Sequence, residues 1–69
     1  MGELEKIHDE ALEHEIWILD HTEQISRLRV KMYEKKDKEQ LAYIVPALNS
    51  LIDEAEKYKE WIKEQGVME

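Results

Sequence analysis

The 69-residue chain contains no cysteine and no phenylalanine, and it has only two glycines and one proline. Without cysteine it cannot form disulfides, thiolate metal sites or thiol nucleophiles. The glycines are Gly2 and Gly66, close to the two ends of the sequence, so no glycine-rich loop is available to bind a phosphate group. These absences exclude cysteine-based chemistry and the common nucleotide-binding loops.

Long apolar runs are also missing from the sequence. The first residues lack the apolar region of a signal peptide, and no stretch approaches the roughly 20 apolar residues of a transmembrane helix. We therefore expect a cytoplasmic protein without a membrane partner. A chain this short buries only a modest fraction of its surface, and small domains compensate with disulfides, a metal or oligomerisation. Because disulfides are excluded, the sequence predicts self-association or metal binding.

Basic residues are scarce relative to acidic ones, with 10 Lys and Arg against 17 Asp and Glu and a net charge of -7. Proteins that bind nucleic acid neutralise phosphates with basic side chains, so this balance argues against a nucleic-acid partner. The charges are also segregated along the chain. Residues 1–24 carry eight acids and one lysine, whereas residues 25–40 carry six bases and three acids. The chain therefore has an acidic beginning and a basic middle.

Apolar residues in the first half recur at alternating spacings of three and four, which is the a/d pattern of a coiled coil. This pattern predicts an α-helix over residues 3–36 that buries one stripe against another helix. We call this stripe the seam, and two of the three histidines lie in it. The seam consists of Leu4, Ile7, Ala11, His14, Ile18, His21, Ile25, Leu28 and Met32.

The heptad pattern resumes after a short basic segment. Asp37, followed three residues later by Gln40, has the spacing of a capping box, so we expect a short loop near 36–37 and a second helix over 38–65. Pro46 predicts a kink or split in that helix, because it lacks an N–H group and clashes with the carbonyl four residues earlier. The short connection predicts an all-α antiparallel hairpin. The expected inner stripe of the second helix comprises Leu41, Ile44, Leu48, Leu51, Ala55, Tyr58 and Ile62.

The first helix carries a second apolar stripe, well round its circumference from the seam. A single hairpin cannot cover both stripes, so we expect two hairpins to form a homodimeric four-helix bundle, or a larger assembly. The charge distribution favours loops at opposite ends, because each basic loop then lies beside the acidic end of the other chain. This outer stripe consists of Leu12, Ile16, Leu19, Val30 and Tyr33.

The candidate metal ligands are Glu10, His14 and His21. Glu10 and His14 are one helical turn apart and can bind one ion, as in di-metal helical bundles. His14 and His21 are two turns apart, about 10.5 Å along the axis, which is too far to share an ion within one helix. A symmetric contact between two chains would join Glu10 and His14 to His21 of the partner subunit, giving sites for a divalent transition metal such as zinc or iron. The alternatives are a structural role, such as His14 bonded to Tyr58 or paired across the dimer, and a pH-sensitive assembly switch.

No catalytic set emerges from the sequence. The hydroxyl candidates are Thr22, Ser26 and Ser50, and Thr22 points away from its neighbour His21 because adjacent helical residues diverge. The sequence therefore predicts a non-enzymatic module for interaction, scaffolding or regulation that acts as a homo-oligomer, without a cofactor and with a protein as its other type of partner. The alternative is the metal-binding bundle with sites between subunits.

Overall fold

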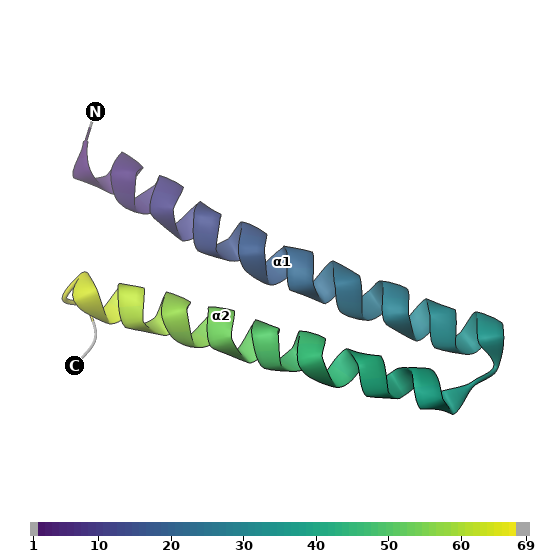
Figure 1. Ribbon diagram of the computed structural model, residues 1–69. Helices are drawn as coiled ribbons and strands as arrows, with labels where there is room; N and C mark the ends of the chain where they lie inside the picture. The colour runs from purple at the N-terminus through teal and green to yellow at the C-terminus, as the bar shows by residue number, and fades with distance from the viewer. Residues whose placement is uncertain (1, 68–69) are drawn as a thin grey trace.

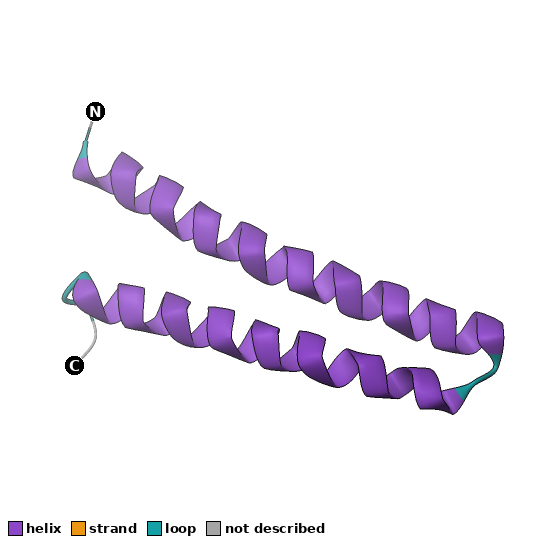
Figure 2. Cartoon of the chain, viewed as in Figure 1, coloured by secondary structure: helices purple, strands orange, loops and turns teal. Residues whose placement is uncertain are grey.

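A computed structural model describes residues 2–67 as two long helices that lie side by side and are joined at one end (Figure 1). Helix α1 spans Glu3–Lys35, the 3-10 helix η1 spans Lys38–Tyr43 and helix α2 spans Ile44–Glu64. The described part of the chain contains no strand (Figure 2). The all-α hairpin predicted from the heptad pattern is confirmed. Within residues 2–67, neither helix is apolar enough over sufficient length to cross a membrane.

The seam of α1 faces α2, as its spacing predicts. Every seam residue from Ile7 to Met32 is partly shielded from solvent, whereas Leu4, at the start of the helix, is 81% exposed. Most of the residues that adjoin a seam residue in the sequence are exposed. The shielding therefore follows the heptad spacing and not the overall hydrophobicity of the segment. The seam is therefore the contact surface within one hairpin.

The connection between the helices depends on a left-handed residue and a capping carboxylate. Lys36 adopts φ 52° and ψ 40°, and its N–H group donates to carbonyls in the last turn of α1. Asp37 then begins η1, where its side chain accepts hydrogen bonds from the backbone N–H of Glu39 at 3.1 Å and from the side-chain amide of Gln40 at 3.4 Å. Asp37 acts as the expected cap, while the side-chain amide of Gln40 donates to the Asp37 carboxylate and does not return to the backbone as in a capping box.

Pro46 lies near the start of α2, and here the structure differs from the kinked helix expected over 38–65. The preceding residues form η1, and α2 begins at Ile44, so Pro46 is the third residue of the α-helix. N–H groups in the first turn have no acceptor within the helix, so the proline removes no hydrogen bond. Near Pro46 the inner stripe differs from the expected one, because Ala47 is only 6% exposed whereas Leu48 is 42% exposed. The other members beyond the turn are partly shielded as expected, namely Ile44, Leu51, Ala55, Tyr58 and Ile62.

The hairpin is a single layer of helices. Its Cα trace measures 51 × 25 × 11 Å and has a radius of gyration of 16.1 Å, whereas a compact domain of this length is expected near 11 Å. The two helices are close together beside the turn and spread toward their open ends (Figure 1). Small Ala47 lies in the half near the turn, and the large side chains of Tyr58 and Trp61 lie in the spread half.

Candidate functional site

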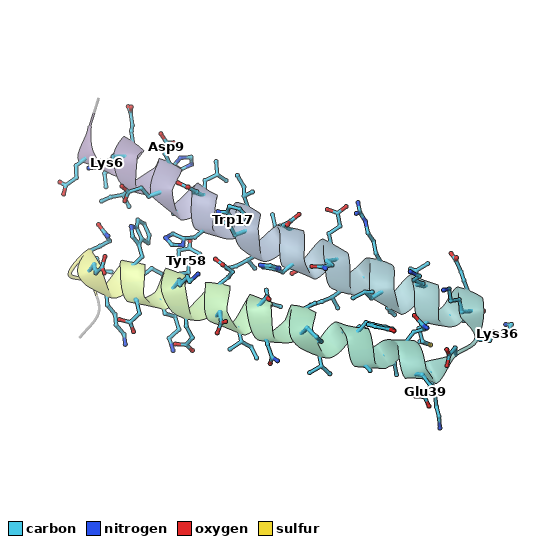
Figure 3. The ribbon with its side chains drawn as sticks, in the orientation of Figure 1. Lys6, Asp9, Trp17, Lys36, Glu39 and Tyr58 are labelled. Atoms are coloured by element: carbon cyan, nitrogen blue, oxygen red, sulfur yellow. The ribbon has the colours of Figure 1, made fainter. Side chains whose placement is uncertain are left out.

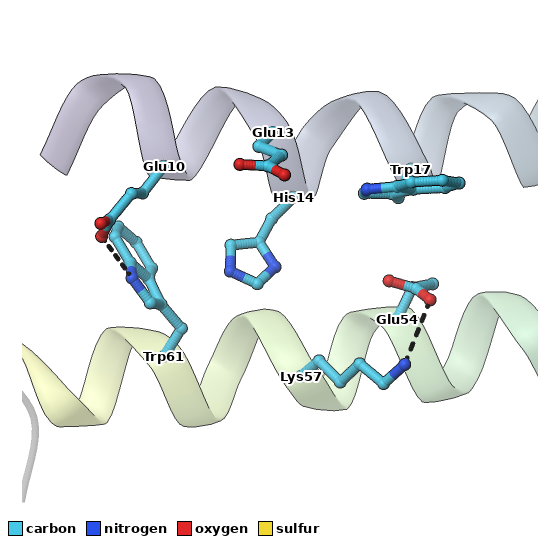
Figure 4. Close-up of a pocket in the computed structure, with 7 residues that line it drawn as sticks. All are labelled: Glu10, Glu13, His14, Trp17, Glu54, Lys57 and Trp61. Atoms are coloured by element: carbon cyan, nitrogen blue, oxygen red, sulfur yellow. Dashed lines mark hydrogen bonds and ion pairs between the residues drawn. The ribbon is translucent and has the colours of Figure 1, made fainter. Parts of the chain in front are cut away.

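The open half of the hairpin contains a groove with aromatic and acidic walls (Figure 4). Its volume is about 580 Å³. We call it the Trp groove because it has one tryptophan from each helix. The lining residues are Glu10, Glu13, His14 and Trp17 of α1, and Glu54, Lys57 and Trp61 of α2.

Helical spacing explains why these side chains meet. On α1, Glu10 and Trp17 are four residues before and three residues after His14, so all three share one side of the helix. On α2, Glu54 and Trp61 have the same spacing around Tyr58. Each helix therefore presents a carboxylate, a central ring and an indole in the same order.

This arrangement reflects a short sequence repeat, Glu-Ala-x-x-(His or Tyr)-x-x-Trp. It occurs at residues 10–17 and again at residues 54–61. Because α1 and α2 are antiparallel, the two copies are related by an approximate twofold axis that passes between His14 and Tyr58. Trp61 thus lies beside Glu10 at one end of the groove, and Trp17 lies across from Glu54 at the other end (Figure 4).

Two rings that line the groove, those of His14 and Trp61, form a cluster of three with the ring of Tyr58. His14 stacks on Tyr58 with a centroid separation of 5.1 Å and an interplanar angle of 6°. The centroid of Trp61 lies 5.4 Å from that of His14 and 6.0 Å from that of Tyr58. Such pairs stabilise a fold by about 0.5–1.5 kcal/mol beyond simple burial. His14 therefore contacts Tyr58 by ring stacking and not by the bond expected from the sequence, because the Tyr58 O–H donates to Glu15.

The two ends of the groove differ despite the repeat. At one end the indole N–H of Trp61 donates a hydrogen bond of 3.0 Å to Glu10. At the other end Trp17 is 52% exposed, and the carboxylate of Glu54 is paired instead with the Lys57 ammonium at 3.4 Å. The Trp61 end is thus tied to α1, whereas the indole of Trp17 remains available to a ligand.

The structure places the three predicted metal ligands in two locations. Glu10 and His14 line the Trp groove, while His21 lies two turns further along the seam. Among residues 2–67, no group of three or more His, Asp or Glu side chains is arranged to hold a metal ion. The proposed site between subunits requires the seam to face another chain, and in this hairpin the seam faces α2. The buried Nδ1 atom of His21 has no hydrogen-bond partner among the described residues.

Tyr58 has a perturbed ionisation. Partial burial raises the pKa of Tyr58 above its usual value of 10.0, and the negative charge of Glu15 and a hydrogen bond to it add to the rise. The phenol O–H donates that hydrogen bond at 3.2 Å. The folded state therefore favours the neutral phenol more strongly than the unfolded chain does.

We expect Glu15→Gln to lower the pKa of Tyr58, because it removes the negative charge that opposes ionisation. In the parent protein the folded pKa exceeds the unfolded value, so this stabilisation is complete below about pH 10 and is lost as pH rises through the folded pKa. An absorbance titration of tyrosinate, in a background with Tyr33→Phe and Tyr43→Phe, measures the shift. Asp20→Asn is the control, and an equal pKa in both variants would contradict the contact.

The Trp groove has an excess of negative charge and an exposed indole. It holds three carboxylates, from Glu10, Glu13 and Glu54, against the single ammonium of Lys57. Carboxylates and the faces of aromatic rings both attract cations. Comparison with known proteins provides no further guidance, since no protein-family model, no curated protein and no solved structure matches the chain.

Proposed function

We propose that the protein is a small non-enzymatic interaction module that acts as a dimer of hairpins, forming a four-helix bundle. The observation that supports this most directly is a set of large apolar side chains, all at least 42% exposed. We call this set the apolar face. It consists of the outer stripe of α1, which is Leu12, Ile16, Leu19, Val30 and Tyr33, together with Leu41, Val45, Leu48 and Ile52.

The helical period supports a single apolar face. At about 100° per residue, the outer stripe lies roughly 145° round α1 from the seam, and the exposed stripe of α2 lies roughly 110° round from the mean direction of its shielded residues. On each helix, the tryptophan lies about 60° round from the residues that face the other helix. This rotation is in the opposite direction to that of the exposed stripe on the same helix. Because both tryptophans line the same groove, the two exposed stripes belong together on the opposite side of the hairpin.

The surface area supports a second layer of helices. The hairpin exposes 5846 Å², whereas a globular monomer of 8.3 kDa is expected to expose about 4,600 Å². The excess is larger than the roughly 800 Å² that each partner buries in an interface of standard size. Domains are normally built from two packed layers, and a second copy of the chain supplies the missing layer.

Charge favours an arrangement with the two turns at opposite ends. Basic Lys36 lies at the turn, whereas acidic Asp9 lies near the open end (Figure 3). With the turns at opposite ends, the basic segment 25–40 of each chain lies beside the acidic segment 1–24 of the other. With the turns together, like charges would meet. Each exposed pair contributes about 0.2–1 kcal/mol, so these charges set the orientation more than the affinity.

Sedimentation equilibrium tests the proposal. We expect a dimer at micromolar concentrations, a melting temperature that rises with protein concentration, and modest weakening in high salt because the charged pairs are screened. A folded monomer throughout that range would rule out the proposed function. Tighter association in high salt would instead indicate that the turns lie together.

A further inference from the structure

We propose that the Trp groove binds the guanidinium group of an arginine in a basic segment of a partner protein. This inference goes beyond self-association, because it concerns the side of the hairpin opposite the apolar face. The groove is formed within one chain, between α1 and α2, so it does not depend on how two hairpins pair (Figure 4). A dimer joined through the apolar faces would carry two such grooves, both open to solvent.

The two tryptophans lie toward opposite ends of the groove, and the space between them can hold one planar cation. Two contacts between the helices, Trp61 with Glu10 and Tyr58 with Glu15, show which residues of α1 and α2 lie opposite each other. In such pairs the two residue numbers add up to 71–73. Trp61 is then level with Ala11, six residues before Trp17, which corresponds to about 9 Å along the helix axis. The groove between the two tryptophans has a volume of about 580 Å³, which leaves room for a guanidinium and its alkyl stem.

The carboxylate of Glu54 is the expected partner of the cation. Its side chain is only 19% exposed, whereas the side chain of Lys57, with which it is paired, is 68% exposed. Lys57 can therefore turn into solvent at little cost and leave a partly desolvated carboxylate facing Trp17. A carboxylate in that setting forms a stronger hydrogen-bonded pair than a fully solvated one.

Arginine matches the combination of an indole and a carboxylate in this groove better than lysine does. Its guanidinium is planar, stacks on aromatic faces and donates two parallel hydrogen bonds to a carboxylate, whereas the lysine ammonium is a compact and strongly hydrated point charge. The groove offers an exposed indole at Trp17 and a carboxylate at Glu54 on facing helices (Figure 4). The acidic segment 1–24 adds a field that speeds the approach of a basic partner.

The experiment titrates the full chain with a short peptide that contains two arginines and follows tryptophan fluorescence. Two matched peptides carry citrulline, which is neutral and nearly isosteric, or lysine at the same positions. We expect the arginine peptide to bind about tenfold more tightly than either matched peptide. Equal affinity of the arginine and citrulline peptides, or of the arginine and lysine peptides, would overturn the proposal.

Variants locate the binding site. Glu54→Gln should weaken binding of the arginine peptide by roughly three- to tenfold, as should Trp17→Leu, because each removes one of the two attractions. Glu56→Gln makes the same charge change on an exposed residue of α2 outside the groove, and it should leave binding unchanged. Circular dichroism checks that all three variants are folded. If Glu56→Gln weakens binding as much as Glu54→Gln does, the attraction is a general effect of net charge and the proposal fails.

Discussion

Replacing Ile25 with aspartate is expected to abolish the folded hairpin at room temperature. Ile25 belongs to the seam, and the register of the helices places it level with Ala47, which is only 6% exposed and marks the closest packing. An unpaired carboxylate at this point costs several kcal/mol in addition to the lost apolar contact. A domain of this length has a total stability of only about 3–10 kcal/mol. Loss of the helical signal in far-ultraviolet circular dichroism measures the effect.

The control for this prediction is Gln24→Asp, which makes the same new residue at the adjacent exposed position. Aspartate in a helix interior costs only a few tenths of a kcal/mol through its lower helix propensity, so this variant should melt close to the parent protein. If the two variants unfold to the same extent, the damage comes from helix propensity. Ile25 would then not have the central position in the contact that we assign to it.

The sequence predicts the seam of α1 well because a helix of more than nine turns repeats the same geometric requirement many times. From Ile7 to Met32, each position expected to face another helix is partly shielded. If the spacing were misassigned at one position, all of the following apolar residues would fall on the wrong side of the helix. A long and uninterrupted stripe therefore allows only one assignment of the side that faces α2. Leu4 is the exception, and it lies in the first turn, where α2 no longer covers it.

The inner stripe of α2 is less predictable because the two kinds of helix before and after Ile44 have different periods. A 3-10 helix has three residues per turn and an α-helix has 3.6, so one period cannot describe the stripe on both sides of Ile44. One continuous period predicted Leu41 and Leu48 inside, yet both are exposed, whereas the five other members of the expected stripe are partly shielded. Pro46 signalled a break, but not that the break would turn Ala47 inward.

The Trp groove was not predicted from the sequence. From the sequence alone, Trp17 and Trp61 are expected in the core or in a dimer contact, with a surface for a partner protein as the alternative, and apolar periodicity ignores the carboxylates beside them. The available signal is the repeat at residues 10–17 and 54–61, which gains meaning only once the helices are known to be antiparallel. Of the predicted metal ligands, Glu10 and His14 do lie in this groove, and His21 lies elsewhere on the seam.

Replacing Leu48 with glutamate is expected to dissociate the proposed dimer while leaving the seam of α1 intact. Leu48 is exposed in the hairpin and belongs to the apolar face, so its burial depends on a second copy. In a symmetric dimer the substitution occurs twice, and two unpaired carboxylates in an apolar interface cost several kcal/mol together. We therefore expect the dimer dissociation constant to rise by at least about a hundredfold, as measured by sedimentation equilibrium.

The neighbouring substitution Asn49→Glu separates loss of the interface from a general effect of negative charge. Asn49 is exposed and lies next to Leu48 on α2, at the polar edge of the apolar face, so Asn49→Glu should weaken assembly far less than Leu48→Glu does. If the hairpin requires the second layer to fold, Leu48→Glu will also lose helical signal, and raising its concentration should restore that signal by mass action. Assembly of Leu48→Glu with the affinity of Asn49→Glu would show that the apolar face is not the interface, because a buried carboxylate cannot be neutral to association.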